Sequence, residues 1–307
     1  MNNLPIVDVV IPTLNCETTI GECLRCLRMQ DYEGKINILI IDGGSIDKTI
    51  SICKEYNCEV YIIPGIYATG LKGARDISLE FCKGELNWQI DSDNFVPDSR
   101  TLTKLVDPFK AIPDIQISMP LISYSEHMSP MDKWFAVFHK IQIERMKKEG
   151  KHERNWVLVN DMTYGITNAA LIRTDLIQKV GGYDSDVRVL SRAREKGLSK
   201  GVIVTDTYYY HIEGGSFLKF LKKQERRIKK FGAFSDNDIK NYFVEANKGH
   251  EGRKNIQRTP LLFLEASYLM LLDRKIFFYW GILVLIIYLF EFLIHPIKFL
   301  NTYRKFL

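Results

Sequence analysis

The stretch NWQIDSDN, residues 87–94, is the part of the sequence that decides the fold, because a short apolar run ends there in two acidic residues. Residues 87–90 are typical of a buried strand. Three earlier apolar runs also predict strands: Val7 to Ile11, Ile36 to Ile41, and Val60 to Ile63. Segments with helical spacing separate these runs: Thr18 to Met29, Asp47 to Tyr56, and Gly70 to Cys82. This alternation predicts an α/β fold with a mostly parallel sheet flanked by helices.

Polar residues follow three of these strands. The first strand ends in Pro12-Thr13-Leu14-Asn15, the second in Asp42-Gly43-Gly44-Ser45, and the fourth in Asp91-Ser92-Asp93. Ligands of open α/β sheets bind outside the carboxyl ends of the strands, so these groups are expected to form one site.

Asp91 and Asp93 are one residue apart on a turn that leaves a strand, so both carboxylates can reach one cation. Oxygen ligands suit Mg²⁺ or Mn²⁺, which commonly bind substrate phosphates as well. The alternative is a solvated acidic turn. A calcium loop of the EF-hand type is excluded because it needs a glycine at its sixth position.

The glycines after Asp42 indicate a turn where the backbone approaches a ligand, and Asp42 is a candidate acceptor for a nucleoside. The alternative is a plain strand-to-helix turn with Asp47 as N-cap. No GxGxxG or GxxxxGK[ST] motif follows any strand, which argues against a dinucleotide enzyme or a P-loop NTPase.

The composition indicates a folded domain in a reducing compartment. A net charge of +5 over 307 residues is modest, so it gives no indication of nucleic-acid binding. Cys23 and Cys26 form one CxxC, but zinc needs four ligands and no second pair follows. Cys23 shares a helical face with Ile20, Leu24 and Leu27, which predicts buried, reduced cysteines.

The C-terminal part contains a candidate membrane helix. Residues 276–294 hold a single charge, Glu291, and approach the ~20 residues that a spanning helix needs. The alternative is a buried core helix. Met1 to Pro5 does not begin a signal peptide, so we expect a cell-membrane protein whose catalytic domain faces the cytoplasm. Basic residues flank the apolar segment on both sides, so its topology stays open.

Together these motifs resemble the family 2 glycosyltransferases of the GT-A fold, including relatives that use polyprenyl-phosphate acceptors. The resemblance rests on residues 10–15, residues 42–49, the Gly70 to Arg75 segment and the acidic triplet. It implies inverting, metal-dependent transfer from a nucleotide-sugar to a lipid-linked or membrane-proximal acceptor. It also implies donor-binding roles for nine residues: Pro12, Thr13, Asn15, Asp42, Arg75, Asp91, Ser92, Gln224 and Arg227.

The resemblance also places a catalytic base and a third metal ligand. Gly181-Gly182-Tyr183-Asp184 resembles the turn that borders the acceptor site, and in this alignment Asp186 takes the position of the base. Asp184 is the second choice, because Ser185 replaces the glutamate usual in the family. His211 resembles a histidine that reaches the metal or the diphosphate, with a structural histidine as the alternative.

The expected domain organisation follows from these assignments. A GT-A domain spans residues 1–235, with a nucleotide-sugar half at about 1–120 and an acceptor half at about 121–235. Its last helix, Phe217 to Phe231, is basic and amphipathic, which suits an anionic membrane surface or simply solvent. A linker at 236–258 leads to a membrane-associated region, 259–307, with its helix at about 276–295.

Two rival functions are considered from the sequence, and the second is disfavoured. A catalytically inactive, membrane-tethered nucleotide-sugar-binding protein of the same fold is favoured by Gly43 and Ser185, which depart from the family pattern. A sugar-phosphate nucleotidyltransferase would need a glycine-rich loop after the first strand, and Pro12-Thr13-Leu14-Asn15 is not such a loop.

Overall fold

The structure is a computed structural model, and it describes residues 4–66, 71–125, 169–183 and 186–212, together with parts of 126–168. Several predicted features lie outside these residues: Asp184, the basic helix with Gln224 and Arg227, the linker, and the apolar segment at 276–295. In the described part of the chain, no helix has both the length and the apolar character needed to cross a membrane.

The first part of the chain, up to the acidic triplet, forms strands and helices in strict alternation. These elements are β1 (Val7–Thr13), α1 (Ile20–Arg28), β2 (Ile36–Asp42), α2 (Thr49–Glu55), β3 (Glu59–Ile62), α3 (Leu71–Ser78) and β4 (Leu86–Gln89). The four strands and three helices that the sequence pattern predicts are therefore confirmed, with small shifts at their ends.

The elements that follow are shorter and less regular. They are β5 (Asn94–Phe95), α4 (Thr101–Ala111), β6 (Ile117–Ser123), β7 (Lys151–His152), β8 (Trp156–Val159), β9 (Leu171–Arg173), α6 (Thr174–Lys179), α7 (Asp186–Glu195) and β10 (Gly201–His211).

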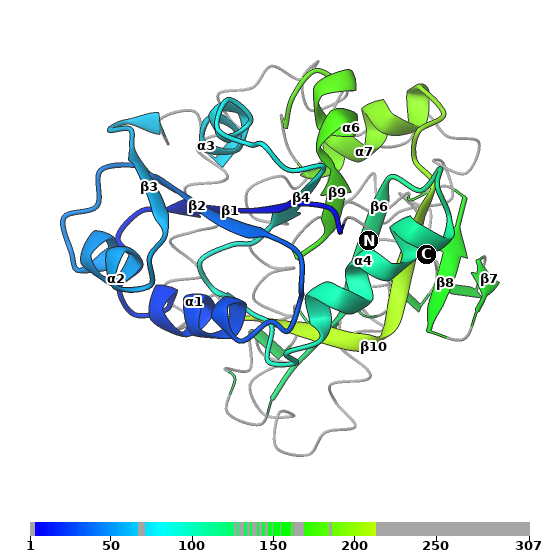
Figure 1. Ribbon diagram of the computed structural model, residues 1–307, viewed down its shortest axis with the longest axis horizontal. Helices are drawn as coiled ribbons and strands as arrows, with labels where there is room; N and C mark the ends of the chain where they lie inside the picture. Colours follow the sequence, from blue (N-terminus) through cyan, green and yellow to red (C-terminus); the bar gives the residue numbers. More distant parts are fainter. Residues whose placement is uncertain are drawn as a thin grey trace, which may run out of the picture.

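Within the described residues the strands form one sheet in the order β3-β2-β1-β4-β9-β6-β10-β8-β7, with β5 paired to β10 (Figure 1). Strands β3, β2, β1 and β4 are parallel, as expected. The second half is mixed, because β9 runs antiparallel to both β4 and β6, and β8 runs antiparallel to β10. The expectation of a mostly parallel sheet therefore holds for the first half and is corrected for the second.

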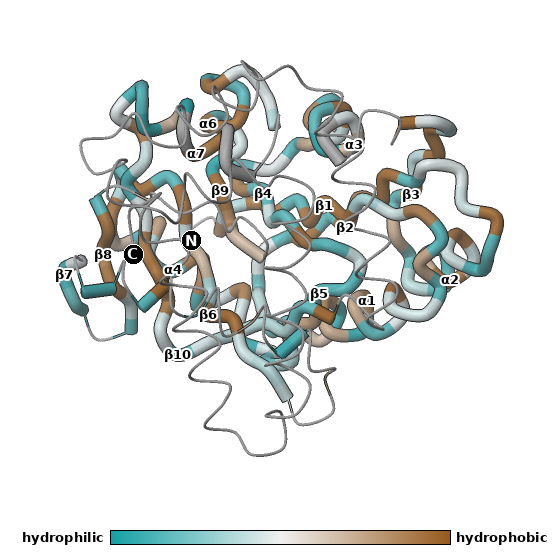
Figure 2. Tube along the Cα trace, turned by 180° about the vertical axis from the view of Figure 1, so that it is seen from behind, coloured by the Kyte–Doolittle hydropathy of each residue, from teal (hydrophilic) through white to brown (hydrophobic). Residues whose placement is uncertain are grey.

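Strand β1 lies in the interior of the sheet and is buried along its whole length. Its odd-numbered apolar residues face α1, whereas Val10 packs with Ala74 of α3, so helices cover both faces (Figure 1). Figure 2 shows the hydrophobic residues along β1 and β2. The one charge in β1, Asp8, is satisfied internally, because it accepts hydrogen bonds from Asn37 Nδ2 and from the Lys83 and Gly84 amides.

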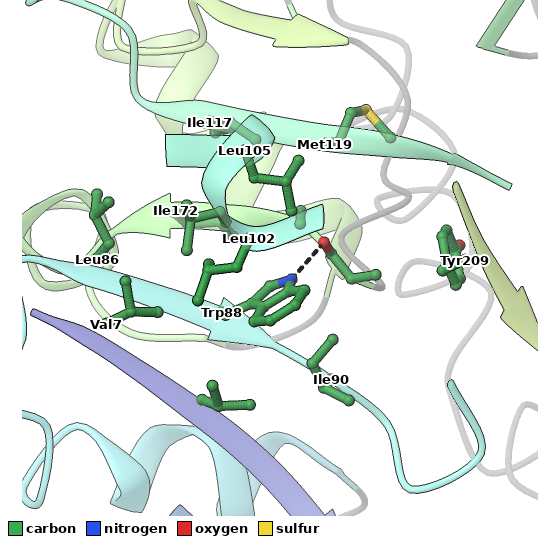
Figure 3. Packing of buried hydrophobic residues seen from close by; sticks show 14 of the residues in the cluster. Val7, Leu86, Trp88, Ile90, Leu102, Leu105, Ile117, Met119, Ile172 and Tyr209 are labelled. Carbon is green, nitrogen blue, oxygen red and sulfur yellow. Dashed lines mark hydrogen bonds between the residues drawn. The ribbon is translucent and has the colours of Figure 1, made fainter. Parts of the chain in front are cut away.

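Trp88 anchors the strand that carries the acidic triplet. Its indole is fully buried beside Leu102 and Leu105 of α4 and Ile172 of β9, and its Nε1 donates a 2.8 Å hydrogen bond to the Ala169 carbonyl (Figure 3). A tryptophan that both fills the core and satisfies its N–H holds the strand rigidly. The turn that follows β4 therefore starts from a fixed point.

Candidate metal and donor site

Three side chains that could hold a metal ion converge beyond the end of β4. One ligand atom each from Asp91, Asp93 and His211 all lie within 4.8 Å of one another. The side chains of Asp93 and His211 are 28% and 13% exposed, so the cluster is open to a ligand on one side. Two carboxylates and an imidazole match Mn²⁺ somewhat better than Mg²⁺, which prefers oxygen ligands throughout.

His211 reaches the cluster because β10 pairs with β5. In this short antiparallel pair His211 lies opposite Asn94, and the Ile212 amide donates a 2.9 Å hydrogen bond to the Asp93 carbonyl. The Asn94 amide donates to the Asp91 carbonyl at 2.9 Å, which closes the turn between the two carboxylates. Backbone pairing, rather than side-chain packing alone, therefore holds the histidine beside the triplet.

Arg75 of α3 binds the first carboxylate of the triplet. Its guanidinium lies 2.6 Å from Asp91 Oδ1 and stacks over the ring of Tyr183, with 4.9 Å between Cζ and the ring centroid. The Arg75 side chain is only 3% exposed. The sequence predicts a donor contact for Arg75, whereas in the structure its charge acts on Asp91 and partly neutralises the acidic cluster.

The loops after β1 and β2 are joined side by side by hydrogen bonds. Asn15 has a positive φ of 50°, its amide donates to Ser45 Oγ, and its Oδ1 accepts from the Ile46 amide. Asp47 accepts from the Glu17 and Thr49 amides. The N-cap residue of α2 is Lys48, so the alternative with Asp47 as N-cap is wrong, although Asp47 accepts from the first amide of the helix. The two loops form one rigid rim.

Asp42 shapes this rim from beneath. Its carboxylate is 0% exposed and accepts four hydrogen bonds, from Thr13 Oγ1, from Ser45 Oγ and from the Gly44 and Ser45 amides. Thr13 and Pro12 are buried as well. In this structure Asp42 and Thr13 organise the turn, and Asn15 is the exposed residue of the set, while the predicted nucleoside contacts of all three stay predictions.

We expect Asp42→Ala to lower the free energy of unfolding by about 3 kcal/mol, because it removes a charged acceptor from buried donors. Asp42→Asn should cost much less, since its Oδ1 still accepts from the amides while the two hydroxyls turn to accept from Nδ2. Urea denaturation measures both. A loss of nucleotide binding in a fully stable Asp42→Asn protein would instead point to a direct nucleoside contact.

Ser92 lies between the two carboxylates of the acidic triplet and is half-buried. Burial raises the pKa of the Cys16 thiol, and it raises the pKa of the fully buried Cys23 further. All six cysteines are free, and Cys23 and Cys26 are buried. The prediction that Cys23 and Cys26 are buried is therefore confirmed.

The Gly181-Gly182-Tyr183 turn is the segment that the family resemblance assigns to the acceptor side of the site. Both glycines have a positive φ, and Asp76 Oδ1 accepts a hydrogen bond from the Tyr183 amide. Helix α7 begins at Asp186, the predicted base, three residues after Tyr183. The sequence alone did not reveal this contact between Asp76 and the Tyr183 amide.

The family comparison agrees with this geometry. Residues 8–181, more than half of the chain, match the model of glycosyl transferase family 2. An N-acetylglucosaminyltransferase of Azorhizobium caulinodans is 34% identical over 113 residues, which are 35% of this chain and 28% of that protein. A second one, from Bradyrhizobium elkanii, is 31% identical over 121 residues, 38% of this chain and 65% of the relative. The matched segment thus spans less than two thirds of either relative.

Solved structures share the fold at low sequence identity. The mannosyltransferase PcManGT from Pyrobaculum calidifontis, in complex with GDP-Man and Mn²⁺, has a TM-score of 0.54 and 18% identity, covering 89% of this chain and 72% of its own. Glucosyl-3-phosphoglycerate synthase from Mycobacterium tuberculosis, in complex with Mn²⁺ and UDP-glucose, has a TM-score of 0.51 and 18% identity, covering 73% and 76%. On the extent of the family match, this chain belongs to glycosyl transferase family 2.

Proposed function

We propose that this chain transfers a sugar from a nucleotide-sugar to an acceptor with inversion, using a divalent cation held by Asp91, Asp93 and His211. The observation that carries the proposal is the convergence of these three ligand atoms within 4.8 Å, beside the rim formed by the β1 and β2 loops. The family match and the nucleotide-sugar complexes of the structural relatives support it.

Each part of the site has a role in this proposal. Asp91, Asp93 and His211 would hold a Mn²⁺ or Mg²⁺ ion, and when bound this ion would supply positive charge to neutralise a leaving nucleoside diphosphate. Arg75 keeps Asp91 in place and limits the repulsion between the two carboxylates. Asn15, at the rim, and Ser92, in the turn after β4, are proposed to face the donor. Gln224 and Arg227 are proposed to add donor contacts, as the family resemblance implies.

Asp186 is the proposed base. At the first turn of α7, beyond the Gly181-Gly182-Tyr183 turn, it would remove the proton of an acceptor hydroxyl as that oxygen attacks the anomeric carbon. The bond to the diphosphate breaks on the opposite face of the sugar, so a single displacement inverts the anomeric configuration. Asp184 is the alternative base. An acceptor that is already an ionised phosphate would need this proton transfer less.

The proposed acceptor is lipid-linked or lies close to the membrane, and the proposed location is the cell membrane with the catalytic domain in the cytoplasm. Support comes from the sequence alone, namely the apolar segment at 276–294 and the basic segment at 217–231. A vesicle-flotation assay with the full chain and with a chain ending at residue 258 tests this part separately.

A thermal-shift screen across UDP-, GDP- and dTDP-sugars, with and without Mn²⁺, tests the donor part of the proposal. We expect one nucleotide class to raise the unfolding temperature only when Mn²⁺ is present, with a stabilisation of about 2.7 kcal/mol at 100 times the dissociation constant. An equal shift without metal in all three classes would contradict a metal-bridged donor.

An assay for released nucleoside diphosphate then distinguishes an enzyme from an inactive binding protein of the same fold. We expect diphosphate release with the donor that gives the shift once an acceptor lipid fraction is added. Donor binding without any release across hydroxyl and phosphate acceptors would favour the binding protein.

A further inference from the structure

Two consecutive residues of α3 reach opposite sides of the site. Arg75 binds Asp91 of the acidic triplet, and Asp76 binds the backbone amide of Tyr183 in the turn before α7. The Tyr183 ring, which is 1% exposed, lies beneath the Arg75 guanidinium. One helical segment is therefore attached both to the metal carboxylate and to the turn that leads to the acceptor side.

The glycine in this turn explains how Asp76 reaches the backbone. A Cβ added at Gly182 would lie 2.6 Å from Asp76 Oδ1, a distance that real Cβ atoms essentially never show. Gly182 also has a φ of +91°, which other residues rarely adopt. The missing side chain lets the carboxylate approach the turn and accept from the next amide.

The same turn is held from its other side by α7. Arg192 donates a 2.8 Å hydrogen bond to the Gly182 carbonyl and a 3.3 Å hydrogen bond to the Gly181 carbonyl. Asp76 therefore accepts from the Tyr183 amide, and Arg192 donates to the carbonyls of the two glycines. Because side chains bind both the donor and the acceptors of this turn, the turn has little freedom to move relative to α3.

We infer that Asp76 is a positioning residue that sets the distance between the metal carboxylates and the acceptor-side residues at the start of α7. The inference rests on the proposed function, because it concerns how that site aligns its two substrates. Asp76 acts through the Tyr183 amide and touches neither substrate. Asp76 affects how the acceptor is aligned for attack on the donor sugar, and it does not affect the affinity for the metal or the donor.

The variants Asp76→Ala and Asp76→Asn test this inference. Alanine removes the acceptor, whereas asparagine keeps an oxygen at the Oδ1 position. A displaced acceptor group slows transfer, so we expect Asp76→Ala to lower kcat by about 10- to 100-fold with the donor KM unchanged. Asp76→Asn should retain most of the activity. Asp175→Ala, which removes an exposed carboxylate of α6, is the matched control and should behave as wild type.

Two further measurements do not depend on activity. In amide hydrogen exchange, the Tyr183 amide should exchange faster in Asp76→Ala and at the wild-type rate in Asp76→Asn. In calorimetric titration, Mn²⁺ affinity should be the same in all variants. If the wild-type protein turns over no nucleotide-sugar, the proposed function is wrong. The hydrogen-exchange rate of the Tyr183 amide then still tests whether Asp76 holds the turn.

Three outcomes would overturn the inference. If Asp76→Ala keeps the wild-type kcat, Asp76 has no positioning role. Parallel losses of donor affinity and kcat, with a lower unfolding temperature, would show a merely structural role. An Asp76→Asn variant as impaired as Asp76→Ala would show that the charge, rather than the acceptor oxygen, matters.

Discussion

We expect Asp93→Ala to abolish sugar transfer and to remove specific Mn²⁺ binding. Asp93 contributes one of three converging ligand atoms, and its carboxylate also lies 3.4 Å from His211 Nε2. Without it, one carboxylate and one imidazole remain, and Arg75 already binds that carboxylate. Two ligands of this kind hold a divalent cation weakly, so the donor diphosphate loses its counter-charge.

Calorimetric titration with Mn²⁺ measures the first effect, and diphosphate release measures the second. Asp206→Asn is the matched control, because Asp206 lies on β10 with His211 but its side chain is 42% exposed and pairs with Lys104 on the surface. The control should bind Mn²⁺ and turn over normally. Normal turnover of Asp93→Ala in metal-depleted buffer would refute the metal role.

The second large effect is expected at Asp186. Asp186→Asn should leave donor and Mn²⁺ binding unchanged while lowering kcat by about 100- to 10,000-fold, the usual contribution of a general base. The reason is that an amide of the same shape cannot accept the acceptor proton. With a phosphate acceptor the loss should be far smaller, because no proton has to leave.

Asp184→Asn serves as the comparison for Asp186→Asn. If Asp184 is the base, the two variants exchange their behaviour, and the kcat loss follows Asp184→Asn. Loss of donor binding in Asp186→Asn would contradict a pure base. The folding of both variants is checked by circular dichroism, because the far-ultraviolet spectrum and the unfolding temperature of the protein should be equal in the two.

The first half of the fold follows from local sequence patterns. Each strand there is a short apolar run that ends in polar residues, and each connecting helix has its own apolar face. In a parallel sheet these features determine where the strand ends meet, so the position of Asp91 and Asp93 could be predicted. His211 was identified only through its resemblance to a family histidine, and it lies at the end of β10.

The second half depends on pairing between distant segments, which local patterns do not reveal. Strand β9 has only three residues, yet it joins β4 to β6 and makes the sheet mixed. Propensity over three residues is too weak to predict such a strand. The pairing becomes favourable only when Leu171 and Ile172 fill the core beside Trp88.

The roles of buried polar groups were equally hard to predict. Asp42 carries a family motif, but its oxygens are taken by donors of its own turn. Asp76 looks like a surface residue of a helix until the Tyr183 amide, 107 positions later, is placed against it. A sequence shows that such a carboxylate is present, whereas only the fold shows which hydrogen-bond donors it meets.

The pairing of β10 with β5 has a consequence for biosynthesis. The histidine of the metal cluster lies more than a hundred residues after the two carboxylates, and it arrives only when the last described strand is in place. A nascent chain that has not yet emerged from the ribosome up to that strand therefore presents an incomplete set of ligands. Tight Mn²⁺ uptake would then follow the pairing of β10 with β5.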